Sequence, residues 1–425
     1  MTMVLPMIAA MFLNMMYNLV DSLWIGNLLG ETAYAALTNS TPIILILTSV
    51  AMGATNGVSI LLSQAIGAKD KKRTESLVAT SFCVAVVFSV LVTVILELLL
   101  PSILSALNTP AETYDMAYSY LSVYVLGYIA IYLYCYFAAV LRSFGNSIFQ
   151  AIAMLTTTIL NAVLDPIFIH FIGFNGAAIA TLLSETICLL FMLVYLKKKK
   201  LFTFKISEFD KSDILLLVQK AVPSVIQQSI PAVSTTFLTA LVSTYSITAI
   251  AAYGVAGKLE IIVFYPAMAL NMVLTTIIGQ CVGGKRYDRA KDYLKCALGY
   301  GCGLLVILSA LVIGFSKQLS GLFVKSDDVA AIVGTYFLIV SIGYLLNTVT
   351  NCYLGALNGM GKPSKSMFLM IFSYIVVRIP LAYLLYYVGF GLNGIWVAVL
   401  VSHVVASIAA CISGTVSFKK QTSRI

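Results

Sequence analysis

A small number of acidic side chains interrupt the long apolar stretches of this chain. Asp21 follows Asn18 by three residues, a spacing that places both side chains on one side of a helix. Asp165 follows Asn161 by four residues and directly precedes Pro166. Carboxylates are costly to bury among apolar groups, so each of these positions is a candidate functional site.

Two buried carboxylates with asparagine neighbours predict one of two kinds of chemistry. Asp21 and Asp165 could take up a proton, because burial and a neighbouring carboxylate both favour the uncharged acid. The same oxygens, together with the Asn161 side chain, could instead ligate Na+. Pro166 has no amide hydrogen, so it leaves a backbone carbonyl unbonded and provides a candidate hinge. A purely structural polar network between two helices is the open alternative.

A second set of polar residues predicts a substrate cavity. The nearest basic neighbour of Glu260 is two residues away, a spacing at which helical side chains do not face each other. We therefore predict that Glu260 faces a central cavity and attracts cationic substrate or serves as a second coupling site, with a structural pairing as the alternative. Asn347 and Asn351 are one helical turn apart and, with Tyr17 and Asn18, complete the predicted lining.

These residues must be positioned by elements that lie mostly in lipid. The chain has 425 residues, of which 60% are hydrophobic and 10% are charged, and its mean hydropathy is +0.98. A soluble domain devotes about a quarter of its residues to charged types, so an ordinary soluble protein is excluded. The apolar stretches run for roughly 20 residues or more, which indicates spanning helices rather than the short alternating strands of an outer-membrane barrel.

We predict an all-α integral membrane protein with twelve transmembrane helices, because a helix satisfies its own backbone hydrogen bonds within the bilayer. The predicted ranges are 3–26, 32–64, 77–99, 113–140, 147–170, 174–196, 214–242, 246–281, 293–315, 329–356, 365–387 and 392–416. The first range is too long for a signal peptide and lacks a basic leader, so no signal peptide is expected.

Lysine and arginine are concentrated in every second loop. The loops after the even-numbered helices and the C-terminal tail hold Lys69, Lys71, Lys72, Arg73, Arg142, Lys197 to Lys200, Lys205, Lys211, Lys285, Arg286, Arg289, Lys291, Lys362, Lys365, Lys419, Lys420 and Arg424. The loops after the odd-numbered helices hold only Lys317 and Lys325. The positive-inside rule therefore predicts that both termini lie in the cytoplasm. This pattern accounts for the net charge of +9, so no nucleic-acid partner is predicted.

The chain repeats itself at an offset of 216 residues, most clearly in the element Gln-x-x-Gly-x-Lys at residues 64–69 and 280–285. Two halves with six helices each enter the membrane in the same orientation, which predicts two parallel lobes related by a pseudo-two-fold axis. The predicted N-lobe covers residues 1–196, a cytoplasmic linker covers 197–213, and the C-lobe covers 214–425. Paired lobes of this kind are typical of transporters that work by alternating access.

The predicted coupling residues are not duplicated. The offset places Phe237 opposite Asp21 and Leu381 opposite Asp165. Packing positions can keep similar residues in both halves, whereas an ion site needs charge only where the ion binds. The sequence therefore predicts coupling chemistry that is specific to the N-lobe.

Several motifs resemble those of the MATE (multidrug and toxic compound extrusion) transporters, and the resemblance covers essentially the whole chain. They are Tyr17-Asn18-Leu19-Val20-Asp21, the repeated Gln-x-x-Gly-x-Lys element, Leu141-Arg142-Ser143-Phe144-Gly145-Asn146, Asn161-x-x-x-Asp165-Pro166 and Asn175-Gly176-Ala177-Ala178-Ile179-Ala180-Thr181. The cluster of Asp21, Asp165 and Asn161 resembles the proposed cation site of the bacterial DinF-like branch. Glu260 resembles a glutamate on the eighth helix of bacterial members. Asn347 departs from the NorM-like pattern, which has an aspartate there.

The resemblance implies a secondary active antiporter of the bacterial plasma or inner membrane, not an enzyme, which exports organic cations and amphipathic toxins in exchange for H+ or Na+. No cofactor is implied. The expected partners are a small amphipathic substrate and membrane lipid, and the expected state is a monomer. A flippase for lipids or lipid-linked precursors is the closest alternative. An intramembrane aspartyl protease is disfavoured, because its Gly-x-Gly-Asp element is absent and the duplication would be unexplained.

Overall fold

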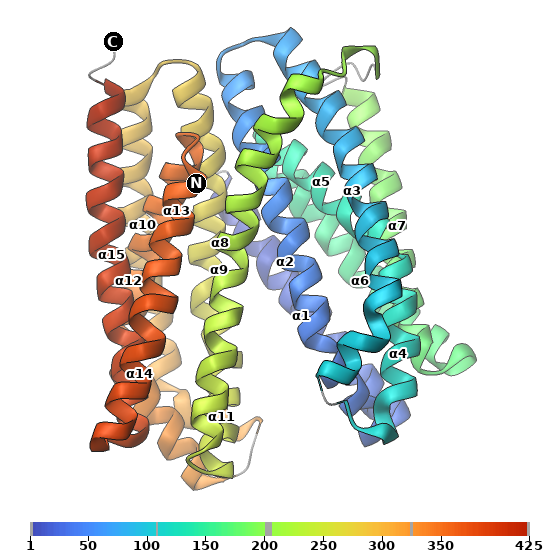
Figure 1. The fold of residues 1–425 in the computed structure, drawn as a ribbon, viewed down its shortest axis with the longest axis vertical. Coiled ribbons are helices and arrows are strands. Elements are labelled where there is room, and N and C mark those ends of the chain that lie inside the picture. Colours follow the sequence, from blue (N-terminus) through green and yellow to red (C-terminus); the bar gives the residue numbers. More distant parts are fainter. Residues whose placement is uncertain (1–2, 108, 200–205, 324–325, 423–425) are drawn as a thin grey trace. The chain divides into compact units, whose positions relative to one another are not determined.

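The computed structural model describes residues 3–107, 109–199, 206–323 and 326–422, which are helical almost throughout (Figure 1). The α-helices are α1 (Val4–Leu29), α2 (Glu31–Gly67), α3 (Lys71–Ala106), α4 (Ala111–Leu126), α5 (Tyr128–Ser143), α6 (Ser147–Ile172), α7 (Phe174–Lys199), α8 (Lys211–Ser243), α9 (Ile247–Gly283), α10 (Tyr287–Gly314), α11 (Ser316–Gly321), α12 (Asp327–Gly359), α13 (Pro363–Met370), α14 (Ile379–Leu385) and α15 (Gly391–Thr422). A 3-10 turn, η1 (Ile206–Glu208), and two π-helical segments, η2 (Ile371–Arg378) and η3 (Tyr386–Phe390), complete the described elements.

The described helices match the predicted twelve-helix membrane architecture. Ten apolar spans are long enough to cross a membrane, and α4 with α5 forms an eleventh that is bent by 48°. The stretch Pro363–Gln421 counts as one of the ten, yet it turns back at Gly389 and Gly391, whose φ angles are 110° and 53°. Because α15 packs against α14 and η2, this stretch is two spans, which brings the total to twelve (Figure 1). The predicted fold class is confirmed.

Helix bounds differ from the predicted ranges where local capping extends them. The third range was expected to begin at residue 77, but α3 begins at Lys71, because the Asp70 side chain accepts a hydrogen bond from the Arg73 amide at 2.9 Å. The Asn146 side chain caps α6 in the same way by accepting from the Phe149 amide at 3.1 Å. The predicted range 113–140 is divided into α4 and α5 at Gly127.

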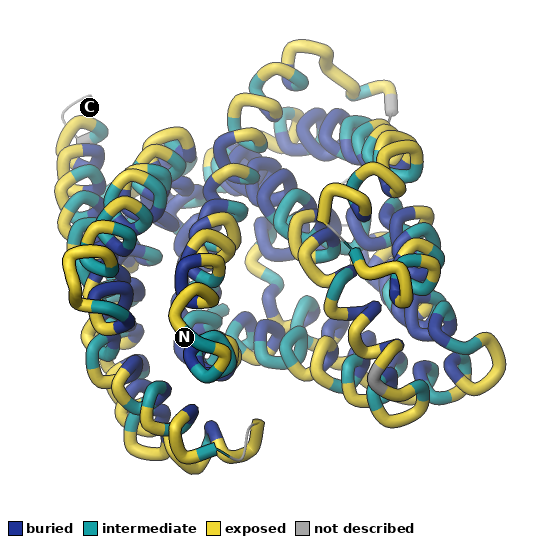
Figure 2. Tube along the Cα trace, turned by 60° about the horizontal axis from the view of Figure 1, so that its bottom comes forward, coloured by how far each residue is buried: buried dark blue, intermediate teal, exposed yellow. Residues whose placement is uncertain are grey.

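Apolar side chains face outward along most helices. Leu98 on α3 is 75% exposed and Phe171 on α6 is 78% exposed, whereas Asn161 and Asp165 are fully buried. Figure 2 shows that exposed and buried stripes alternate around the helices. This distribution is the reverse of that in a soluble protein, so the outer faces are suited to lipid.

The chain forms two compact units. The first unit comprises residues 1–62 and 70–221, and the second comprises 63–69 and 222–425. Within the first unit, α6 packs against both α1 and α7, and α3 packs against α4 and α5. Within the second unit, α12 packs against α9, α10 and α15. The α1–α6–α7 and α9–α12–α15 contacts hold most of the predicted site residues.

The end of the predicted linker packs on α3 within the first unit. The buried Asp213 carboxylate forms an ion pair with Arg73 at 2.5 Å and accepts a hydrogen bond from the Ser76 hydroxyl at 3.2 Å. Nearby, hydrogen bonds from Ser212 hold the pKa of the exposed Asp210 carboxyl below its usual value. Four basic residues of the predicted loop pattern lie outside the described residues, namely Lys200, Lys205, Lys325 and Arg424.

Candidate functional site

Asp165 lies at the centre of a polar cluster in the first unit. The amide of Asn161, one turn earlier on α6, donates a hydrogen bond to Asp165 Oδ1 at 2.9 Å. The same amide nitrogen approaches the hydroxyl of Thr181 on α7 at 3.5 Å. Because α6 packs between α1 and α7, this face of α6 is fully buried. The structure therefore brings Asn161 and Asp165 together, while their role in ion coupling stays a prediction.

Asp21 joins this cluster from α1. Its side chain is 9% exposed, and it interacts electrostatically with Asp165 across the α1–α6 contact. Three oxygens have no hydrogen-bond partner among the described residues, namely Asp21 Oδ1, Asp165 Oδ2 and Asn161 Oδ1. Within the same described part of the chain, neither aspartate forms an ion pair with a lysine or arginine. A buried carboxylate with unused acceptor positions can take up a proton or a cation.

The donor set is consistent with Na+ as well as with H+. The described residues contain no group of three or more His, Cys, Asp and Glu side chains that could hold a metal ion. A coupling Na+ at Asp21 and Asp165 would therefore also need amide or carbonyl oxygen, and Asn161 Oδ1 is an unused one.

Tyr17 and Asn18 lie in different surroundings. Tyr17 is one turn before Asp21 on α1 and is buried, and its hydroxyl has no hydrogen-bond partner among the described residues. Asn18 is exposed on the first unit, and its amide donates to the backbone carbonyl of Asn14 at 2.8 Å. The structure thus places Tyr17 in the aspartate cluster and leaves Asn18 outside it.

Two residues of α7 belong to the cluster but were absent from the predicted site. Thr181 approaches Asn161, and Glu185 interacts electrostatically with Tyr17. Glu185 Oε2 is buried without a hydrogen-bond partner in the described part of the chain. The spacing of four residues between Thr181 and Glu185 places both on one helix face, which is a signal that sequence reasoning could have used.

Pro166 lies inside α6, next to Asp165. The helix continues across it as one element to Ile172, although proline removes one hydrogen bond from the ladder. The position is suitable for a hinge, and that role stays a prediction.

Glu260 lies in a separate polar cluster in the second unit. Its Oε1 accepts hydrogen bonds from the hydroxyls of Tyr336 at 2.6 Å and Tyr344 at 3.0 Å, both on α12. The ring of Tyr336 packs edge-on against Trp396 of α15, with centroids 4.8 Å apart. Glu260 is therefore bound by two tyrosines within its own unit, and its predicted role in attracting substrate stays a prediction.

Asn347 and Asn351 form a chain of amides along α12. Asn351 donates to the Asn347 side-chain oxygen at 3.2 Å and accepts from the Asn271 amide of α9 at 3.1 Å. Within the described residues, no hydrogen bond joins these asparagine side chains to Glu260. The structure therefore divides the predicted cavity residues of the second unit into two neighbouring groups on the α9–α12 contact.

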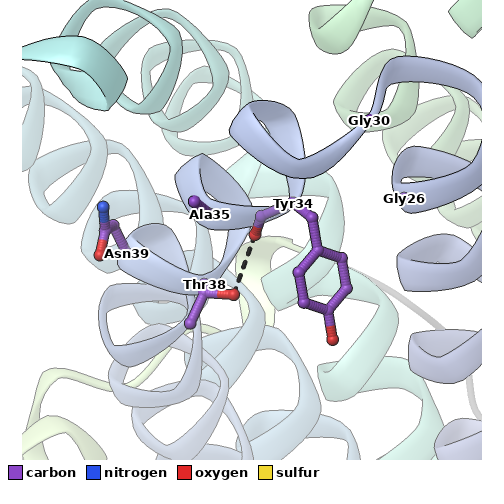
Figure 3. Close-up of a pocket in the computed structure, with 6 residues that line it drawn as sticks. All are labelled: Gly26, Gly30, Tyr34, Ala35, Thr38 and Asn39. Atoms are coloured by element: carbon purple, nitrogen blue, oxygen red, sulfur yellow. Dashed lines mark hydrogen bonds between the residues drawn. The ribbon is translucent and has the colours of Figure 1, made fainter.

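A pocket of about 440 Å³ lies at the junction of α1 and α2, away from these clusters. It is lined by Gly26, Gly30, Tyr34, Ala35, Thr38 and Asn39 (Figure 3). The Thr38 hydroxyl donates to the Tyr34 carbonyl at 2.9 Å, so this hydroxyl is already used within the helix. None of the predicted site residues lines the pocket.

Comparison with known proteins identifies relatives along nearly the whole chain. A probable multidrug resistance protein, YoeA of Bacillus subtilis, is 26% identical over 92% of this chain and 88% of its own length. A FAD transporter of Shewanella oneidensis is 25% identical over 95% of this chain and 91% of its own length. A crystal structure of MATE in the bent conformation has a TM-score of 0.93 and 23% identity, covering 100% of this chain and 95% of that chain.

The MatE family model matches the chain twice, over residues 6–167 and again over 223–384. The starts of the two matches are separated by nearly the same offset as the internal repeat, and together they cover more than half of the chain. The chain therefore belongs to the MatE family of multidrug efflux transporters and is a multi-pass membrane protein, not an enzyme.

Proposed function

We propose that the protein is a secondary antiporter that exports amphipathic organic cations in exchange for inward H+ or Na+. The observation that carries this proposal is the buried cluster of Asp21, Asp165 and Asn161, in which three oxygens have no partner among the described residues. Such a site is costly to maintain in a membrane unless a proton or cation occupies it during the working cycle. We further propose a monomer in the bacterial plasma membrane with both termini in the cytoplasm.

The cluster is suited to ion coupling because its net charge depends on whether a proton or Na+ is bound. A ligand can drive a conformational change only if it binds the two states with different affinity. Asp165 is fully buried here, so a state that exposes it to water would change its affinity for H+ or Na+. Asn161 orients Asp165 through the 2.9 Å hydrogen bond and would hold the carboxylate in place when the ion leaves.

A second candidate function is export of an anionic amphipath. One relative is named a FAD transporter, and the second unit of this chain holds a buried arginine, Arg378, that is 6% exposed. Its guanidinium forms no ion pair with a carboxylate among the described residues, so it could attract an anionic group of a substrate.

Efflux from proteoliposomes tests both candidates. The full chain is reconstituted, ethidium or FAD is loaded, and a proton gradient or a sodium gradient is imposed separately. We expect ethidium to leave faster when one of the two ion gradients is imposed than when no gradient is imposed, and not to respond to the other. Movement of FAD alone would select the second candidate, and no gradient-driven movement of either compound would refute the antiporter proposal.

A further inference from the structure

The second unit contains a half-buried acid, Glu260, and a buried base, Arg378. Glu260 on α9 is bound by Tyr336 and Tyr344 of α12, as described above. A second cluster, on η2 and α15, is built around Arg378.

Arg378 is fixed by three contacts. Its Nε donates to the Ser402 hydroxyl at 2.7 Å, and its terminal nitrogen lies 3.2 Å from His403 Nε2. The guanidinium also lies over the ring of Tyr374, 3.9 Å from the centroid. None of these three partners is a carboxylate. The site positions the positive charge without neutralising it.

The two charged groups are joined by packed side chains. A Cβ placed on Gly343 of α12 would lie 3.1 Å from the His403 ring, so α12 and α15 approach each other closely at this point. Phe264, one turn after Glu260 on α9, packs against both Tyr344 and His403, with ring centroids 5.7 and 6.3 Å away. Glu260 and Arg378 are thus connected through Tyr344, Phe264 and His403, and they form no ion pair within 4 Å in the described part of the chain.

The first unit has no comparable balance at its acidic cluster. Asp21 and Asp165 interact with each other, and the buried Arg142 lies in the last turn of α5. Among the described residues, no hydrogen bond or ion pair connects Arg142 with either aspartate. The first unit therefore holds two acids with no base bonded to them, whereas the second holds one acid and one base.

We propose that Arg378 sets the charge selectivity of the second unit by balancing the charge of Glu260. The second unit then presents no net charge to the substrate, and coupling to a cation is confined to the first unit. This proposal rests on the antiporter function proposed above. Arg378 is a positioning residue in this scheme, because it acts on the substrate through its effect on the field of Glu260. Removing either charge alone would leave the opposite charge unbalanced in a medium of low dielectric constant.

A double-mutant cycle tests the balance. Binding of ethidium, a permanent cation, and fluorescein, an anion, is measured by fluorescence polarisation on the purified full-length protein. We expect Arg378→Gln to tighten ethidium binding about tenfold and weaken fluorescein binding, and Glu260→Gln to do the reverse. The double variant should return to within about twofold of the original affinities, and Arg378→Lys should remain close to them.

A matched control removes another positive charge from the same unit. Lys258 lies on α9 two residues from Glu260 and is exposed, so Lys258→Gln should leave both affinities unchanged. An equal change in this control would mean that net charge, and not the balance between two positions, decides binding.

The proposal is overturned if Arg378→Gln and Glu260→Gln change ethidium affinity in the same direction, or if the double variant keeps the affinity of either single variant, because the two charges would then not offset each other. If Arg378→Gln does not yield folded protein, Arg378→Met removes the charge without burying a new amide and completes the same cycle. The binding measurements require no ion gradient. If gradient-driven efflux is absent, the antiporter proposal is refuted, but the binding measurements still test whether Arg378 balances Glu260.

Discussion

Asp165 combines complete burial with an oxygen that has no hydrogen-bond partner in the described residues. Its other oxygen is held by Asn161 at 2.9 Å. An isosteric amide would preserve that geometry in part but could not take up a proton or carry negative charge. A substitution of Asp165 by asparagine can therefore remove ion coupling while it largely preserves the packing of the side chain.

Asp165→Asn should reduce gradient-driven efflux to the rate of protein-free liposomes while leaving substrate affinity within about threefold, because uncoupled binding needs no titrating group. Efflux rate and ethidium affinity are measured on the same preparation. Asn161→Ala provides a comparison, since it removes the orienting hydrogen bond but keeps the carboxylate, and it should weaken efflux less. Near-normal pumping by Asp165→Asn would move the coupling site elsewhere, with Glu260 as the first alternative.

Sequence spacing could predict the members of a site that share one helix. Asn161 and Asp165 are four residues apart on α6, and the hydrogen bond between them follows from that spacing. The partners of Glu260 could not be predicted in this way, because Tyr336 and Tyr344 are 76 and 84 residues distant and meet it only through the α9–α12 contact. Asn18 is exposed on the first unit, and its predicted place in the lining of the substrate cavity stays a prediction.

At the scale of elements, the ends of α2 and α9 cross with almost no space between their backbones. A Cβ on Gly67 would lie 2.0 Å from the Gln280 carbonyl oxygen, and one on Gly283 would lie 1.9 Å from the Gln64 carbonyl oxygen. The Gln64 amide also donates to the Gly359 carbonyl of α12 at 2.8 Å. The repeated Gln-x-x-Gly element thus has a physical explanation, because a reciprocal crossing needs glycine on both helices.

Gly67→Ala and Gly283→Ala should each lower the free energy of unfolding by about 1–3 kcal/mol, because the added methyl group would meet backbone that cannot move aside. Thermal unfolding of the purified protein measures the change. Gly254 on α9 has no atom within 4 Å of an added Cβ, so Gly254→Ala is the matched control and should be neutral or slightly stabilising. Similar unfolding temperatures for Gly67→Ala and Gly254→Ala would contradict the tight crossing.

The existence of the spanning helices could be predicted from hydropathy, but their internal breaks could not. The predicted range 113–140 contains the bend at Gly127, and the range 365–387 contains the π-helical segment η2, which ends at Arg378. Hydropathy averages over about a helix length and is insensitive to such local changes in hydrogen bonding. Breaks of this kind depend on the neighbouring helices, which hydropathy does not describe.

At the scale of the whole molecule, the two compact units and the predicted lobes divide the chain at different residues. Residues 63–69, the end of α2 and the turn after it, belong to the second unit, whereas Lys211–Ala221 of α8 belongs to the first. Close packing explains why the start of α8 belongs to the first unit, because a Cβ on Gly57 of α2 would lie 2.6 Å from Ala221. The predicted lobe limits at residues 196 and 214 stay a prediction of sequence symmetry.

The orientation of the chain in the membrane is also a prediction, and it follows from the excess of lysine and arginine in every second loop. It can be tested with cysteine substitutions and a maleimide that does not cross membranes. Ser105 in the last turn of α3 and Ser207 in η1 are both exposed, so each can be replaced without disturbing a packed core. The exposed native Cys296 is first replaced by serine to lower the background.

Ser105→Cys should react in intact cells, whereas Ser207→Cys should react only after the membrane is permeabilised. The physical reason is that an odd number of spans, three by the predicted count, separates the two positions, and the basic residues hold the second on the cytoplasmic side. Labelling of both cysteines from the same side would contradict the predicted number of spans between them. Labelling of the two in the reverse order would preserve the twelve helices but invert the protein, and the proposed direction of transport would then have to be reversed as well.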